Sequence, residues 1–137
     1  MAKRKKETYK PKLFESTGIS SDTSSNIYVS MLLSKSWQRL SKNAQILYVY
    51  CKAQYYAEKT IPKPKVAQLT EQQLDKCFTM NKSKWLHLYK IYKSDNGQFN
   101  KDIEQLIQLG FVELVECGKT TRTKNIYMLS DKWQQNK

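Results

Sequence analysis

The chain has 137 residues, 39% of them hydrophobic, and its 24 Lys and Arg against 12 Asp and Glu give a formal net charge of +12 at pH 7. This length and composition predict one domain with one modest core, and the positive excess favours a polyanionic partner, most often nucleic acid and next an acidic membrane surface. Three scattered cysteines, with no secretory signal and no membrane span, argue against a disulfide framework and indicate a cytoplasmic protein.

The first segment is a polar tail. Residues 1–26 combine a basic cluster, "MAKRKKETYKPK", with a Ser/Thr/Gly/Asp run, "ESTGISSDTSSN". Such a segment holds too few apolar side chains to offset the entropy lost on ordering, so we predict a disordered tail over 1–26 and a folded domain over 27–137. The run "IYVSMLL", 27–33, is interpreted as a strand or a buried extended lead-in, although it is too short for periodicity to separate strand from helix.

The strongest helix signal follows. Apolar side chains spaced three and four apart predict a helix over 42–57, with Ser41 placed to accept its first free backbone amides. Beyond it, Pro62 and Pro64 remove amide donors and push their preceding residues away from helical geometry. That stretch is therefore interpreted as a connector.

Two further helix signals lie between 70 and 93. Thr70 and Gln73 form a weak capping box, which predicts a short helix in "TEQQLDKCFTM". Asn81 is placed to cap a clearer amphipathic helix in "NKSKWLHLYKIYK". The apolar face of that second helix is predicted to consist of Trp85, Leu88, Tyr89 and Tyr92.

The last helix signal ends at a glycine and leads into a hairpin signal. After the turn sequence "SDNG", the pattern "QFNKDIEQLIQLG" predicts a helix that Gly110 ends in a left-handed conformation. Alternating residues over 111–116 and the run "NIYMLS" then predict two antiparallel strands, joined by a loop that contains Gly118 and the basic sequence "KTTRTK".

Helix, turn, helix, glycine stop and basic hairpin is the order of a winged-helix domain. The predicted fold class is accordingly mainly α with a small β component (α+β), a winged helix-turn-helix with a C-terminal β-hairpin wing. The chain resembles, over 27–133, the winged-helix domains of replication initiators and replisome organisers from Gram-positive plasmids, phages and other mobile elements. The stretches that carry the resemblance are "SKSWQRLSKNAQILYVY", "NGQFNKDIEQLIQLGFVEL" and "NIYMLSDKW".

The resemblance implies that the helix over 98–109 is a recognition helix, whose first residues enter a major groove while the hairpin lies along the backbone or minor groove. Asn and Gln side chains match the N6 and N7 groups of adenine, and Lys101 is suited to a guanine edge or a phosphate. The candidates for direct base contact are Gln98, Asn100, Lys101 and Gln105. A polar helix face that is merely solvated is the structural alternative.

The hairpin loop and the tail supply the remaining candidates. Basic and hydroxyl side chains in the loop are suited to phosphate oxygens, and Arg122 is the best candidate for insertion into a narrow minor groove. The wing candidates are Lys119, Thr120, Thr121, Arg122 and Lys124. The tail candidates, which would add nonspecific affinity, are Lys3, Arg4, Lys5 and Lys6. The alternative for the loop is that its charges merely keep the hairpin from pairing with other chains. The alternative for the tail is a solvated or targeting-like basic run.

Signals for catalysis are weak. With His87 as the one histidine, the chain cannot build the paired-histidine metal site of nicking enzymes, and no cysteine pair has zinc-site spacing. Asp102 and Glu104 are two residues apart on a helix and do not converge. No Gly-rich phosphate loop with its Lys and Ser/Thr is present. We therefore expect a non-enzymatic protein with no metal and no cofactor.

These observations predict a non-catalytic double-stranded DNA-binding protein of a mobile element, acting in replication initiation or its control. Transcription regulation uses the same contacts and is the first alternative. A protein-interaction module in a replication or conjugation complex is the alternative from another class, with replication or conjugation proteins as partners. No membrane partner is expected. Whether the chain forms a homodimer stays open, because "IYVSMLL" can either pair across a two-fold axis or complete its own sheet.

Overall fold

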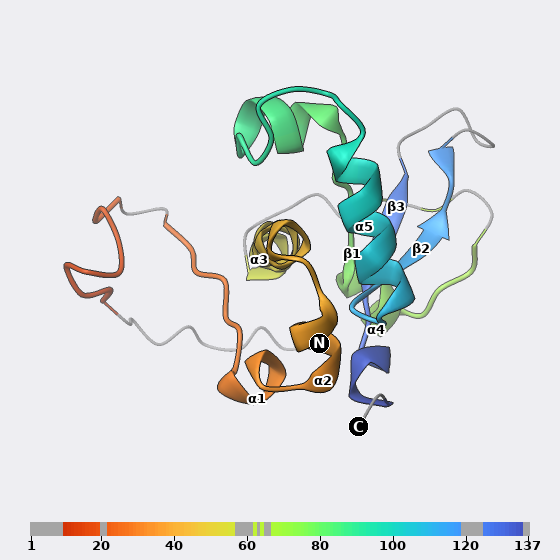
Figure 1. Cartoon of the computed structure of the whole chain (residues 1–137), viewed down its shortest axis with the longest axis horizontal. Coiled ribbons are helices and arrows are strands. Elements are labelled where there is room, and N and C mark those ends of the chain that lie inside the picture. Colours follow the sequence, from red (N-terminus) through yellow and green to blue (C-terminus); the bar gives the residue numbers. More distant parts are fainter. Residues whose placement is uncertain are drawn as a thin grey trace.

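The computed structural model describes residues 10–19, 22–56, 62, 64, 67–118 and 125–135 (Figure 1). At its centre, helix α3 (Lys42–Tyr56) packs against helix α5 (Gln98–Gln108), and both contact a small sheet. Helix α3 begins where predicted, because the Ser41 hydroxyl oxygen accepts the backbone N–H of Ala44 at 3.2 Å. The predicted helix over 42–57 is thereby confirmed as far as Tyr56.

Two short helices, α1 (Val29–Leu32) and α2 (Lys35–Arg39), precede α3. The interpretation of "IYVSMLL" as a strand or extended segment is wrong, because its amides bond locally: the Leu33 N–H donates to the Val29 carbonyl at 3.0 Å. Ser34 then ends one helix and begins the next, since its hydroxyl oxygen accepts the N–H of Trp37 at 3.2 Å. Of α1 only Met31 is buried, which leaves most of this segment at the surface.

The sheet consists of β1 (Cys77–Phe78), β2 (Val112–Glu116) and β3 (Ile126–Leu129), all antiparallel and in the order β1-β3-β2. The predicted hairpin is confirmed as β2 and β3, with a β-bulge between Leu114 and Glu116. Strand β1 was not predicted. The coarse fold class is confirmed: helices combined with a small antiparallel sheet, an α+β arrangement.

The connection from α3 to α5 contains helix α4 (Glu71–Asp75) and η1 (Ser83–Leu88). The capping box of Thr70 and Gln73 at α4 is confirmed. The helix predicted after Asn81 is shorter and wider than expected. Its hydrogen bonds span five residues, as in the 2.8 Å bond from the Tyr89 N–H to the Lys84 carbonyl, so η1 is a π-helix. Leu88 consequently points outward, 65% exposed, and does not join the apolar face predicted for it.

The corner between α5 and β2 is closed by a glycine and by the C-terminal turn η2 (Lys132–Gln135). Gly110 has φ +88°, as predicted for a left-handed helix end, and an added Cβ would lie 2.6 Å from the Trp133 backbone nitrogen. Trp133 in turn stacks on Phe111 with ring centroids 5.7 Å apart. Its carbonyl accepts the hydroxyl of the fully buried Ser36 at 2.9 Å. Helix α2, α5 and the sheet are thus tied together at one point.

Candidate nucleic-acid interface

Helix α5 presents two opposite faces. Phe99, Ile103 and Leu106 are buried, while the side chains one turn apart on the other side are exposed. We call this exposed row the outer stripe, which consists of Asn100, Lys101, Glu104 and Gln108. Two of the predicted base-contact residues, Asn100 and Lys101, therefore lie at the surface in the first turns of the helix. Glu104 and Gln108 were not among the predicted base-contact residues, although the same four-residue spacing from Asn100 points to both.

The other two predicted base-contact residues have partners inside the protein. The Gln98 side-chain amide donates to the Asp102 carboxylate at 2.8 Å. The Gln105 side-chain oxygen accepts the backbone N–H of Ser41 at 2.9 Å, at the start of α3. Gln105 thereby satisfies one of the free amides of another helix. Gln105 thus joins α5 to α3, whereas Gln98 bonds within α5, and neither residue belongs to the outer stripe.

The amino-terminal end of α5 is held by a buried carboxylate. Asp102 is 2% exposed and accepts the Tyr92 hydroxyl at 2.5 Å as well as the Gln98 amide. Burial, reinforced by the hydrogen bond to Asp102, raises the pKa of Tyr92 well above its usual range. Just before the helix, the Asn96 side-chain oxygen accepts the Gln98 N–H at 3.1 Å. Asn100 and Lys101 are thus displayed from a helix end whose position is firmly set.

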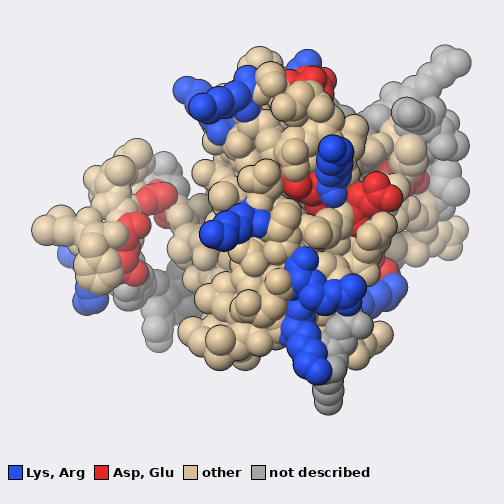
Figure 2. Space-filling model, in the orientation of Figure 1, with Lys and Arg blue, Asp and Glu red and all other residues tan. Residues whose placement is uncertain are grey.

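Exposed basic side chains flank the carboxyl-terminal half of α5. The contact between Ser41 and Gln105 places the junction of α2 and α3, on either side of which Arg39 and Lys42 lie in the chain, beside α5. The contact between Ser36 and Trp133 brings α2 against η2. On this face, basic side chains gather over α2 and η2, whereas both signs of charge occur over α5 (Figure 2). We call the exposed basic residues of α2, α3 and η2 the basic flank: Lys35, Arg39, Lys42 and Lys132.

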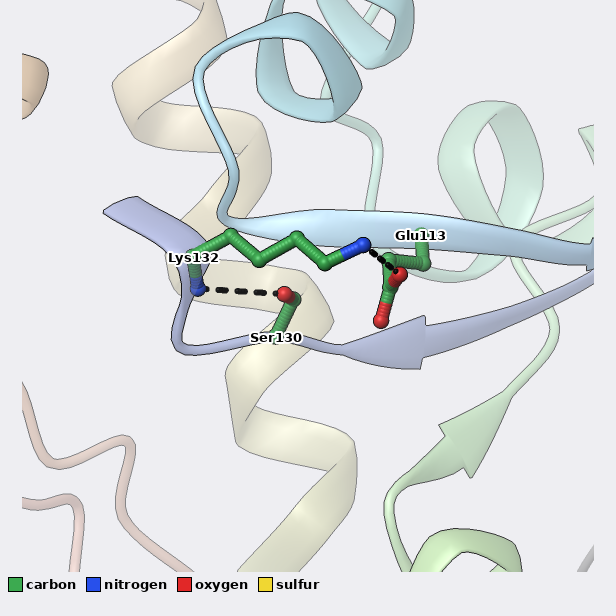
Figure 3. A network of polar contacts seen from close by, with 3 residues as sticks. All are labelled: Glu113, Ser130 and Lys132. Carbon is green, nitrogen blue, oxygen red and sulfur yellow. Dashed lines mark hydrogen bonds and ion pairs between the residues drawn. The ribbon is translucent and has the colours of Figure 1, made fainter. Parts of the chain in front are cut away.

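One member of the basic flank is already paired. The Lys132 ammonium lies 2.6 Å from a Glu113 carboxylate oxygen of β2, and its backbone N–H donates to the Ser130 hydroxyl at 3.2 Å (Figure 3). The hydrogen bond to Glu113 raises the pKa of Lys132. Among the residues that the structure describes, Lys35, Arg39 and Lys42 have no such ion pair. These three carry the uncompensated positive charge of the flank.

The predicted wing residues 119–124 and tail residues 3–6 lie outside the described residues. The base of the hairpin is described. The Gly118 N–H donates to the Asn125 side-chain oxygen at 2.6 Å, which holds the two ends of the loop together. The side-chain amide of Asn125 in turn donates to the Tyr127 hydroxyl at 3.3 Å. The two ends of the loop are therefore held together next to the paired strands β2 and β3.

In the described part of the chain, the Lys84 ammonium and the Cys51 thiol have structural roles in the packing of η1 against α3. Lys84 donates to the Gln54 side-chain oxygen at 2.7 Å and to the Thr79 carbonyl at 2.9 Å, joining η1 to α3 and to the end of β1. Burial raises the pKa of the Cys51 thiol, and nearby Lys84 offsets this only in part.

No group of three or more His, Cys, Asp or Glu among the described residues is arranged to hold a metal ion. None of the described helices is long and apolar enough to cross a membrane.

Comparison of the chain with protein-family models, with curated proteins and with solved structures finds no match.

Proposed function

We propose that this protein binds double-stranded DNA as a winged-helix domain, with α5 as the recognition helix and the β2–β3 hairpin as the wing. The order of elements supports this assignment. Helix α3, the short helix α4, strand β1, η1, α5 and the hairpin follow one another along the chain, and β3 lies between β1 and β2. This is the order expected of a winged helix, in which the last helix before the hairpin reads a groove.

The observation that carries the proposal is the outer stripe beside the basic flank. Asn100 offers a paired donor and acceptor suited to adenine, and Lys101 is suited to guanine or phosphate. Glu104, one turn further, adds an acceptor of the kind that pairs with the cytosine amino group. Arg39 and Lys42 lie next to the contact between α3 and α5, so they are placed to hold phosphates on one side of the major groove that α5 would enter.

The biological role proposed is replication initiation or its control on a mobile element, with transcription regulation as the alternative output of the same contacts. Fragments selected by the full chain from a random duplex pool separate these roles. Repeated direct sites support an origin function, and a single palindromic consensus supports regulation.

The roles of the stripe and of the flank are separable by substitution. Asn100→Ala is expected to cost about 1–3 kcal/mol on a selected site and little on unrelated duplexes. Arg39→Ala is expected to weaken binding to all duplexes and to reduce the slope of log affinity against log salt by about one. Lys82→Ala is the matched control, because its ammonium is already paired with Asp95 at 3.3 Å. Equal loss on every sequence for Asn100→Ala would remove that residue from base readout.

A further inference from the structure

Apolar side chains are exposed on the side of α3 that faces away from α5. Tyr28 precedes α1, Val29 begins it and Leu33 follows it, and Ile46 and Val49 lie one turn apart on α3. We call these five residues the apolar face. Their exposed fractions are 75% for Tyr28, 66% for Val29, 73% for Leu33, 50% for Ile46 and 36% for Val49. We infer that the apolar face binds the same face of a second copy of this chain.

Two hydrogen bonds hold the segment around α1 against α3, and so bring the two parts of the apolar face next to each other. The Ser25 hydroxyl donates to the Val49 carbonyl at 2.8 Å, three residues before Tyr28 in the chain. The Gln45 side-chain amide, next to Ile46, donates to the Trp37 carbonyl of α2 at 3.0 Å. The segment that contains α1 is therefore fastened to α3 at both of its ends. In Figure 1, α1 and α3 lie on the side of α5 opposite to β2 and β3.

The size of the apolar face suits a specific contact. At these exposures the five side chains present on the order of 600 Å², taking roughly 100–250 Å² for each when fully exposed. A standard interface buries about 800 Å² per partner, so the face would form most of one, with its polar margin supplying the rest. An apolar patch of this size on a small protein is typical of an interaction site.

Charge favours a second copy as the partner. Residues 26–34 contain no charged side chain, in a chain that carries +12. Two molecules with so large a like charge repel one another wherever their basic surfaces meet. A neutral face is the place at which two copies can approach at the lowest electrostatic cost, and a two-fold contact matches it with itself. An acidic partner would instead be drawn to the basic flank.

A dimer of this kind has a consequence that rests on the proposed function. A two-fold axis through the apolar face leaves both copies of α5 outside the interface, beyond α3. Packed helices lie about 8–10 Å apart, so the steps from one α5 through both α3 helices to the other give on the order of 30 Å. Adjacent major grooves on one side of DNA are about 34 Å apart, so such a dimer is suited to two half-sites one helical turn apart.

Self-association is measured without DNA, so its outcome does not depend on the proposed function. The full chain is sedimented to equilibrium over a range of concentrations, in enough salt to screen the repulsion between copies. The wild type is expected to show a monomer–dimer equilibrium. Leu33→Asp is expected to weaken dimerisation at least about tenfold, because it places an unpaired carboxylate in the interface. Leu88→Asp is the matched control, since Leu88 is 65% exposed on η1 and the charge change is the same.

Three results would overturn the inference. The first is a wild type that stays monomeric at every concentration, and the second is equal weakening by Leu88→Asp and Leu33→Asp. The third is loss of the dimer in a Leu13→Asp, Phe14→Asp variant but not in Leu33→Asp. Leu13 and Phe14 are exposed at 101% and 84%, so that third pattern would assign the contact to the tail.

Discussion

Alanine substitutions at Gly110 and Gly97 separate two effects of replacing a glycine: the strain of a left-handed backbone, and the clash of the added Cβ with its neighbours. Gly110 and Gly97 have nearly the same backbone angle, with φ of +88° and +87°. An alanine Cβ at Gly110 would lie 2.6 Å from the Trp133 nitrogen and 2.7 Å from the Lys132 carbonyl carbon, whereas at Gly97 nothing lies within 4 Å. Both substitutions carry the strain of a left-handed L-residue, about 1–2 kcal/mol. Only Gly110→Ala also forces η2 away from the core.

The additional cost at Gly110 follows from the contacts that η2 makes. Moving Trp133 weakens its 3.0 Å hydrogen bond to the Gly110 carbonyl and its 2.9 Å bond from Ser36, each contributing about 1 kcal/mol. The stacking of Trp133 on Phe111 contributes about 0.5–1.5 kcal/mol more. We therefore expect Gly110→Ala to destabilise the protein by about 3.5–5.5 kcal/mol and Gly97→Ala by about 1–2 kcal/mol. Urea unfolding followed by tryptophan fluorescence measures both, and equal losses would refute the role given to η2.

Two further predictions concern the support of α5. Tyr92 has a raised pKa in the folded protein, so its contribution to stability is present below its ordinary pKa of about 10 and declines as the pH rises beyond it. Tyr92→Phe should reduce this decline in pH-dependent unfolding, and an unchanged alkaline decline would contradict the assignment. Gln105→Ala should destabilise the protein by about 0.5–1.5 kcal/mol, because the Ser41 amide loses its acceptor. Its sequence preference in DNA-binding assays should be unchanged, and a changed preference would return Gln105 to the reading residues.

Local patterns predicted the longer helices, their caps and the hairpin, but not α1, whose hydrogen bonds are also local and whose four residues are too few to show a period. The apolar spacing of α3 and α5, the cap at Ser41, the capping box at Thr70 and the left-handed end at Gly110 are all properties of neighbouring residues. The hairpin followed from alternation on both sides of a basic loop. The outer stripe could be predicted for the same reason, because it lies on the side of α5 opposite to the buried apolar side chains.

Elements that depend on distant partners were not predicted. Strand β1 has two residues, and it is a strand because Cys77 and Phe78 pair with Met128 and Tyr127, some fifty positions further along the chain. The hydrogen bond from Ser36 to Trp133, which brings α2 against η2 and so helps to form the basic flank, spans 97 positions. Likewise, nothing next to Gln105 in the sequence shows that its oxygen binds Ser41.

Binding of duplex DNA by α5 and its basic flank is tested most directly by the salt dependence of affinity for a mixed-sequence duplex. Each neutralised phosphate contributes about −0.9 to the slope of log affinity against log salt. Contacts from Lys35, Arg39, Lys42 and Lys101 predict a slope of about −3 to −4, and steeper if the wing also binds phosphate. A slope near zero, or no binding at low salt, would contradict the assignment of this surface to DNA.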